Sequence, residues 1–167
     1  KLYKVVNSFA EQVKKVATED KASLAEAGLS FNIHTIIGGQ MVGDDGHKLY
    51  LIYPQGNWIE IGGASPFMII GNSGYGKPIL NRSITKDVGI PFALKTGLLS
   101  FDSTRVCAND VGYPIDVFIM EKGSFKIKQH RFEEKDLDQF SEQWAEVLKD
   151  GINAIPEDWV NLVNDKE

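Results

Sequence analysis

The sequence predicts an α+β protein in which helices pack on antiparallel sheets. Helical periodicity occupies both ends of the chain, and β-branched runs are closely spaced between residues 31 and 71. The turns that join these runs are too short for parallel neighbours, which need a crossover of about a dozen residues. Strands and helices fall into separate runs, as is typical of α+β folds.

Length and composition narrow the class of protein. The chain has 167 residues and a net charge of −5, so we expect one domain over residues 1–167 and no nucleic-acid partner. No apolar run reaches the roughly 18 residues of a membrane span, which predicts no membrane association. Cys107 is the single cysteine, so no internal disulfide can form. A cytoplasmic location is expected.

The first half of the chain reads as two helices followed by a meander. The first helix is predicted from Tyr3 to Ala17, and a short one over residues 21–27 ends at Gly28. The apolar stripe of the first helix would be Val5, Phe9, Val13 and Val16. Four strands are expected over residues 31–42, 47–54, 58–63 and 65–71, with turns at Asp45-Gly46 and Gln55-Gly56-Asn57.

The second half returns to helices around one hairpin. Pro78 is expected to open a short helix. A long helix from Ile90 to Ala108 would have Phe92, Leu94, Leu98 and Phe101 as its stripe. A hairpin over residues 114–121 and 124–131 would turn at Lys122-Gly123. A last helix with Leu137, Phe140, Trp144 and Leu148 on one face would end at Gly151.

The segment Gly71–Lys77 matches the spacing GxxxxGK of a phosphate-binding loop. Such a loop needs a hydroxyl side chain after the lysine to bind magnesium, and here that residue is Pro78. Phosphate loops also follow a parallel strand, whereas the preceding run belongs to a predicted meander. A glycine-rich bend is the favoured interpretation, and nucleotide binding stays as an alternative.

Other side chains with chemical potential do not form a complete constellation in the sequence. Ser103 and Cys107 are candidate nucleophiles, but no histidine lies near them in sequence. Asp102 lies in the long helix and is expected to make a polar contact near its carboxyl end. We expect no cofactor and no metal site, because the three histidines are not spaced as ligands.

Four segments resemble the ancestral β subunit family of bacterial proteasome-type proteases. They are LAEAGLSFNIHTIIGGQ, LYLIYPQGNWIE, IGNSGYGKPILNRSI and SFDSTRVCANDVGYPIDV. They occur in the order and spacing of that family and span the chain from about Leu24 to Met120. The resemblance implies the αββα four-layer sandwich of amino-terminal-nucleophile hydrolases, without its first strands.

The resemblance also implies function. The nucleophile of that superfamily is an amino-terminal Thr whose α-amine acts as base, assisted by an Asp and a Lys. We expect all three upstream of Lys1, so that the present chain alone is inactive. The parent would be a subunit of a threonine peptidase acting on peptides or unfolded proteins. A non-catalytic assembly subunit of the same fold is the alternative.

Some supporting residues carry over from the family. The loop at Gly71 and Ser73 corresponds to a Gly-Ser-Gly turn that supports the proteasome site, although the supporting Ser falls on Gly71. Asp110 stands where relatives have Ser. Residues that match the subfamily pattern without an assigned role are Asp102, Ser103 and Asp116.

Self-association into a closed or open ring of identical subunits is a further implication of the resemblance. Four aromatic residues in and around the meander, Tyr50, Tyr53, Trp58 and Phe67, are expected to contribute to its interface.

Overall fold

The computed structural model describes residues 1–62, 65–160 and 162 of the chain. Its elements alternate between helices and strands in the order that the sequence predicts, and the α+β class is confirmed. They are α1 (Leu2–Glu19), α2 (Lys21–Glu26), β1 (Thr35–Gly39), β2 (Lys48–Ile52), β3 (Trp58–Ile61), α3 (Lys77–Ser83), α4 (Ile90–Cys107), β4 (Ile115–Met120), β5 (Ile127–Phe132), α5 (Glu134–Asn153) and a 3₁₀ turn (Asp158–Val160).

The strands form two antiparallel sheets. The first has the order β1-β2-β3, and β4 and β5 form the second. Leu51 at the centre of β2 pairs with Ile36 of β1 and Ile59 of β3. Gly56 turns the chain between β2 and β3 with a φ of 71°, a conformation that glycine adopts without strain. The predicted hairpin turns are therefore present.

The predicted fourth strand of the meander is wrong. Residues 65–71 contain an apolar run but no strand. A strand needs hydrogen bonds to a neighbour, and no strand of the described residues pairs with this segment. Ser65 instead donates its hydroxyl to the carbonyl of Phe67 at 3.0 Å, which is a local turn contact.

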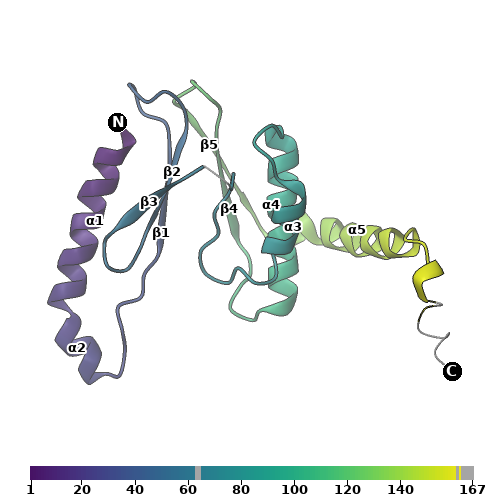
Figure 1. Ribbon diagram of the computed structural model, residues 1–167, viewed down its shortest axis with the longest axis horizontal. Helices are drawn as coiled ribbons and strands as arrows, with labels where there is room; N and C mark the ends of the chain where they lie inside the picture. The colour runs from purple at the N-terminus through teal and green to yellow at the C-terminus, as the bar shows by residue number, and fades with distance from the viewer. Residues whose placement is uncertain (63–64, 161, 163–167) are drawn as a thin grey trace.

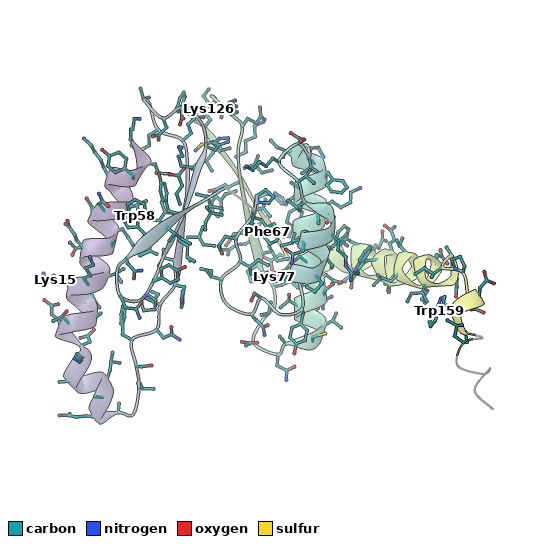
Figure 2. The ribbon with its side chains drawn as sticks, viewed as in Figure 1. Lys15, Trp58, Phe67, Lys77, Lys126 and Trp159 are labelled. Carbon is teal, nitrogen blue, oxygen red and sulfur yellow. The ribbon has the colours of Figure 1, made fainter. Side chains whose placement is uncertain are left out.

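A hydrophobic core lies between α1 and the first sheet. Its fully buried side chains are Val6 of α1 and Ile52 of β2. The other core residues are Leu2, Ala10 and Tyr50, with Ile37 and Trp58 packed around them. Trp58 lies between α1 and the strands in Figure 2, and its indole N–H donates to Asn7 at 2.9 Å.

The predicted stripe of α1 is largely wrong. Val5, Phe9 and Val16 are exposed, and only Val13 of the predicted set is buried. The apolar arc of α1 is wider than the face that the sheet covers, because it includes two adjacent stripes. Periodicity identified one stripe, and the sheet packs on the other.

The start of α1 is held by a carboxylate from the β1–β2 connection. Oδ2 of Asp44 accepts hydrogen bonds from the backbone amides of Leu2 at 3.1 Å and Met41 at 3.0 Å. The first amides of a helix have no partner inside it, so this carboxylate satisfies one of them. These bonds lower the pKa of Asp44 despite the opposing effect of desolvation.

The long helix α4 buries polar residues rather than its predicted apolar stripe. The buried side chains are Thr96, Ser100, Asp102 and Thr104, whereas Phe92 is exposed. The hydroxyl of Thr104 donates to the carbonyl of Ser100 at 2.9 Å, so it needs no partner outside the helix. This internal bond lets the polar face pack closely against the chain around α3.

Two other predictions need correction. The last helix continues through Gly151 to Asn153, because a glycine costs only about 1 kcal/mol in a helix and ends it only where the backbone changes conformation. Tyr50 is a core residue, 3% exposed, rather than an interface aromatic. It meets Trp58 edge to face, with the ring centroids 5.3 Å apart.

Figure 1 shows the arrangement of these elements. The helix α1 lies along the outer side of the first sheet, the β4–β5 hairpin follows, and α3 and α4 lie beyond it. The helix α5 projects away from the rest on the side opposite to α1. No helix in the described part of the chain has the length and apolarity to cross a lipid bilayer.

Removing buried atoms from the core should be costly. Ile52→Ala is expected to lower the free energy of unfolding by about 2–5 kcal/mol, because Ile52 is 1% exposed. Ile59→Ala removes the same atoms from an exposed position on β3, so its cost should stay below about 1 kcal/mol. Urea denaturation measures both, and equal losses would contradict this assignment of the core.

Candidate functional site

The Gly71–Lys77 loop is held against α4. Gly71 has a φ of 78°, so the bend begins in a conformation that favours glycine. At Gly76 a Cβ atom would lie 2.7 Å from the carbonyl oxygen of Ser100 and would collide with the Ser100 hydroxyl. Only glycine allows this approach, which fixes the loop and the start of α3 on the polar face of α4.

This geometry favours a structural bend over a phosphate-binding loop. The amide of Lys77 already donates to the carbonyl of Ser73, at 3.3 Å. Pro78 is the second residue of α3 and has neither an amide hydrogen nor a hydroxyl. The segment before Gly71 is not a strand of a parallel sheet. The features that would cradle a phosphate are therefore engaged or replaced in this loop.

A hollow of about 380 Å³ lies beside this loop. Phe67, Met68 and Ile69 form its apolar wall, and it also has polar side chains from the loop and α3. Figure 2 shows Phe67 and Lys77 close together in front of α3 and α4. The polar lining residues are Ser65, Ser73, Lys77 and Asn81. Such a lining can hold a polar chain by hydrogen bonds while an apolar side chain rests on the wall.

Asp102 makes the polar contact that its position in α4 predicts. Its carboxylate, 6% exposed, accepts a hydrogen bond from Nη2 of Arg105 at 2.7 Å. The same nitrogen reaches the Ser141 hydroxyl on α5 at 3.3 Å, and the guanidinium lies 5.4 Å from the ring centre of Tyr113. The bond to Asp102 raises the pKa of Arg105. This cluster ties α4 to α5 and to the segment before β4.

Sequence reasoning did not identify Arg105 as the partner of Asp102. The signal was present, because an acidic and a basic residue three positions apart lie on one side of a helix. Tyr113 and Ser141 gave no such signal, since their contacts with Arg105 are between separate elements.

The other candidate residues on and after α4 are not assembled with a base. Ser103 is half-buried, Cys107 is exposed at the end of α4, and Asp110 is exposed in the turn that follows. Among the residues that the structure describes, neither Ser103 nor Cys107 hydrogen-bonds through its side chain to a histidine or a carboxylate. The structure therefore does not bring together a nucleophile and its base at these positions.

Asp116 lies on the β4–β5 hairpin, away from the Gly71–Lys77 loop in sequence and in contacts. Both of its oxygens accept hydrogen bonds from Arg131 on β5, at 2.7 Å and 2.6 Å. These bonds lower the pKa of Asp116. A matching pair joins Glu121 and Lys128 at 2.6 Å in the same hairpin and lowers the pKa of Glu121.

A larger cavity of about 920 Å³ lies between the two sheets. Gly38 and Gly39 of β1 give one wall without side chains, and Phe118 and Met120 of β4 contribute the opposite wall. Lys48 lines it and bonds to Glu60 at 3.0 Å, which raises the pKa of Lys48. Sequence reasoning missed this cavity because its walls come from segments about 80 residues apart.

The close approach at Gly76 has a direct test. Gly76→Ala is expected to lower the free energy of unfolding by about 1–3 kcal/mol, because the added methyl group collides with the Ser100 backbone. Gly74→Ala is the matched control in the same loop, since nothing lies within 4 Å of its Cβ position. Thermal unfolding measures both, and a neutral Gly76→Ala would refute the packing.

The ion pair of Asp116 predicts a pH response. Arg131→Ala should raise the Asp116 pKa toward the ordinary value of about 3.9, as followed by its carboxyl ¹³C resonance. In the wild type the stabilising effect is complete above that value and is lost as the pH falls through the lowered pKa. Lys128→Ala should shift Glu121 upward and leave Asp116 unchanged, so an equal shift of Asp116 in both variants would contradict the pairing.

Comparison with solved structures gives consistent relatives. The chain matches a Gly-1 mutant of Anbu from Hyphomicrobium sp. strain MC1 with a TM-score of 0.85 and 34% identity, covering 94% of this chain and 65% of that one. Anbu, the ancestral β-subunit, from Yersinia bercovieri matches with a TM-score of 0.84 and 34% identity, covering 93% and 65%.

A third match is a helical assembly of the Anbu complex from Pseudomonas aeruginosa, with a TM-score of 0.85, 34% identity, and coverage of 92% and 64%. No protein-family model matches the sequence, and a comparison with curated proteins gives no significant match. The chain thus spans just under two-thirds of the length of the solved relatives that it matches. Over nearly all of its own length, it belongs to the ancestral β subunit family of proteasome-type proteins.

Proposed function

We propose that this chain is part of a subunit of a proteasome-related threonine peptidase that hydrolyses peptide bonds in peptides or unfolded proteins. The observation that carries the proposal is the match to ancestral β subunits at 34% identity over 92–94% of the chain. That identity extends through the Gly71–Lys77 loop and α4, where the family resemblance places residues that support the site.

The nucleophile of this proposal is an amino-terminal Thr in the part of the relatives that precedes the matched region. An α-amine has a pKa of about 8, so near neutral pH it can accept the Thr hydroxyl proton while the oxygen attacks the peptide carbonyl. Backbone amides would hold the resulting oxyanion. The unpaired state of Ser103 and Cys107 supports a nucleophile outside the present chain.

The present chain would supply the scaffold of that site. The layers visible in Figure 1 support an αββα sandwich, with α1 on one side and α3 and α4 on the other. The cavity between the sheets has room for further strands beside β1, whose Gly38 and Gly39 present backbone to it. The rigid contact between Gly76 and α4 would fix the supporting loop at the edge of the site.

A non-catalytic assembly subunit is the second candidate. Two of the acidic residues that match the subfamily are engaged by arginines: Asp102 by Arg105 and Asp116 by Arg131. These ion pairs give both carboxylates a structural role that needs no catalysis. The two candidates differ in one residue of the longer protein, the one exposed at its processed amino terminus.

The proposal predicts where activity lies. The 167-residue chain should not cleave fluorogenic peptides, whereas a version extended by its upstream segment should do so. Replacing the amino-terminal Thr of the extended version by Ala should remove the activity, because the hydroxyl is the nucleophile. Inactivity of the extended, correctly processed protein would favour the assembly subunit. Turnover by the present chain that disappears in Ser103→Ala or Cys107→Ala would refute the proposal.

A further inference from the structure

The helix α5 carries one apolar stripe that is covered only in its first half. Leu137, Phe140 and Trp144 are half-buried where α5 meets α4, and Ser141 on the same side bonds to Arg105. The stripe continues at the next helical positions. Its continuation, here called the distal stripe, consists of Val147 (56% exposed), Leu148 (46%) and Ile152 (68%).

This continuation is unusual because Gly151 would have been a natural place for the helix to end. Instead α5 extends to Asn153 and projects beyond the rest of the molecule (Figure 1). Three large apolar side chains at spacings of one and four residues then face solvent together on one side of the helix. Scattered apolar residues on a surface are ordinary, but a contiguous stripe on a projecting helix indicates a contact surface.

A second uncovered stripe lies on α1. Its residues are Val5 (45% exposed), Phe9 (40%) and Val16 (41%), here called the outer stripe. They lie beside the face that packs on the first sheet, at positions that recur on one side of the helix. In Figure 2 the side chain of Lys15 points outward from α1, away from the sheet, so this side of the helix meets no other part of the described chain.

The two stripes are complementary in charge. The helix α5 carries six acidic side chains and two lysines. Lys1 and α1 together carry four lysines and two glutamates. Lys4 and Lys15 lie one helical turn apart or less from Val5 and Val16, so they border the outer stripe. Opposite charges around two apolar stripes favour contact between them and disfavour contact of α5 with another α5.

The stripes lie at opposite ends of the molecule. Figure 2 shows Lys15 of α1 at one end and Trp159, just after α5, at the other. One chain therefore cannot bring its own two stripes together, but a second copy can cover each of them. A contact between two different surfaces is heterologous, and its repetition produces a ring or an open helix. One of the relatives forms a helical assembly.

We propose that the distal stripe of α5 docks on the outer stripe of α1 in a second copy of this chain. The proposal rests on the self-assembly that accompanies the proposed function, and it does not depend on catalysis. It specifies a head-to-tail contact in which Leu148 packs against Phe9 of the next copy. Each copy in the middle of an assembly uses both of its stripes.

Two single variants test this contact by sedimentation velocity over a range of concentrations. Leu148→Asp and Phe9→Asp each place a charge in the stripe, so each should weaken self-association by at least about 30-fold. Both residues are exposed, so far-UV circular dichroism should show unchanged helix content. Gln139→Asp introduces the same charge on the opposite side of α5 and should associate as the wild type does.

An equimolar mixture of the two variants separates a head-to-tail contact from a symmetric one. A Leu148→Asp chain keeps its outer stripe and a Phe9→Asp chain keeps its distal stripe, so one intact contact remains. The mixture should therefore form a heterodimer and nothing larger. Monomers in the mixture would overturn the proposed pairing of the stripes.

The remaining outcomes also decide. Variants that associate as tightly as the wild type would refute both stripes while leaving self-assembly intact. A wild-type chain that stays monomeric at every concentration would refute the contact together with the assembly on which it rests. Peptidase activity in the extended protein is a separate measurement, so its failure is distinguishable from either result.

Discussion

The packing of α1 on the first sheet is the contact on which the first half of the structure depends. Val6 and Ile52 are the two side chains that it removes fully from solvent. Around them, the Asp44 carboxylate fixes the start of the helix and the Trp58 indole bonds to its second turn. The turn at Gly56 approaches the helix so closely that a Cβ atom would lie 2.7 Å from the Ala10 carbonyl. Loss of the apolar contact would release all three of these polar contacts.

The second half is held by a different kind of interaction. The buried face of α4 is polar, and it is joined to its neighbours by the Asp102–Arg105–Ser141 hydrogen bonds and by the glycine contact at Gly76. Directional bonds and a close backbone approach define relative positions more sharply than an apolar interface, which tolerates sliding. This explains how a loop with few regular hydrogen bonds, Gly71–Lys77, can have one defined position beside the proposed site.

Sequence patterns predicted the features that arise from neighbours along the chain. Hairpin turns, the ends of α4 and the apolar stripe of α5 follow from local spacing, and each is present. Features set by distant neighbours were missed. The face of α1 that is buried depends on which stripe the sheet meets, and residues 65–71 lack a strand because no partner lies beside them. Asp102 was recognised as polar and engaged, but the extension of its contact to Ser141 required the fold.

The surfaces for assembly and the surfaces near the proposed site do not overlap. The cavity between the sheets is lined by residues such as Gly38, Lys48 and Met120, whereas the two uncovered stripes lie on α1 and on the far end of α5. A head-to-tail contact through those stripes would leave the cavity and the Gly71–Lys77 loop unaltered within each copy. Because α5 is joined to α4 through Arg105, a force on the distal stripe would be transmitted to the helix that supports the loop. Assembly could therefore affect the site only through this one connection, which makes Arg105 the residue at which the two roles of the chain meet.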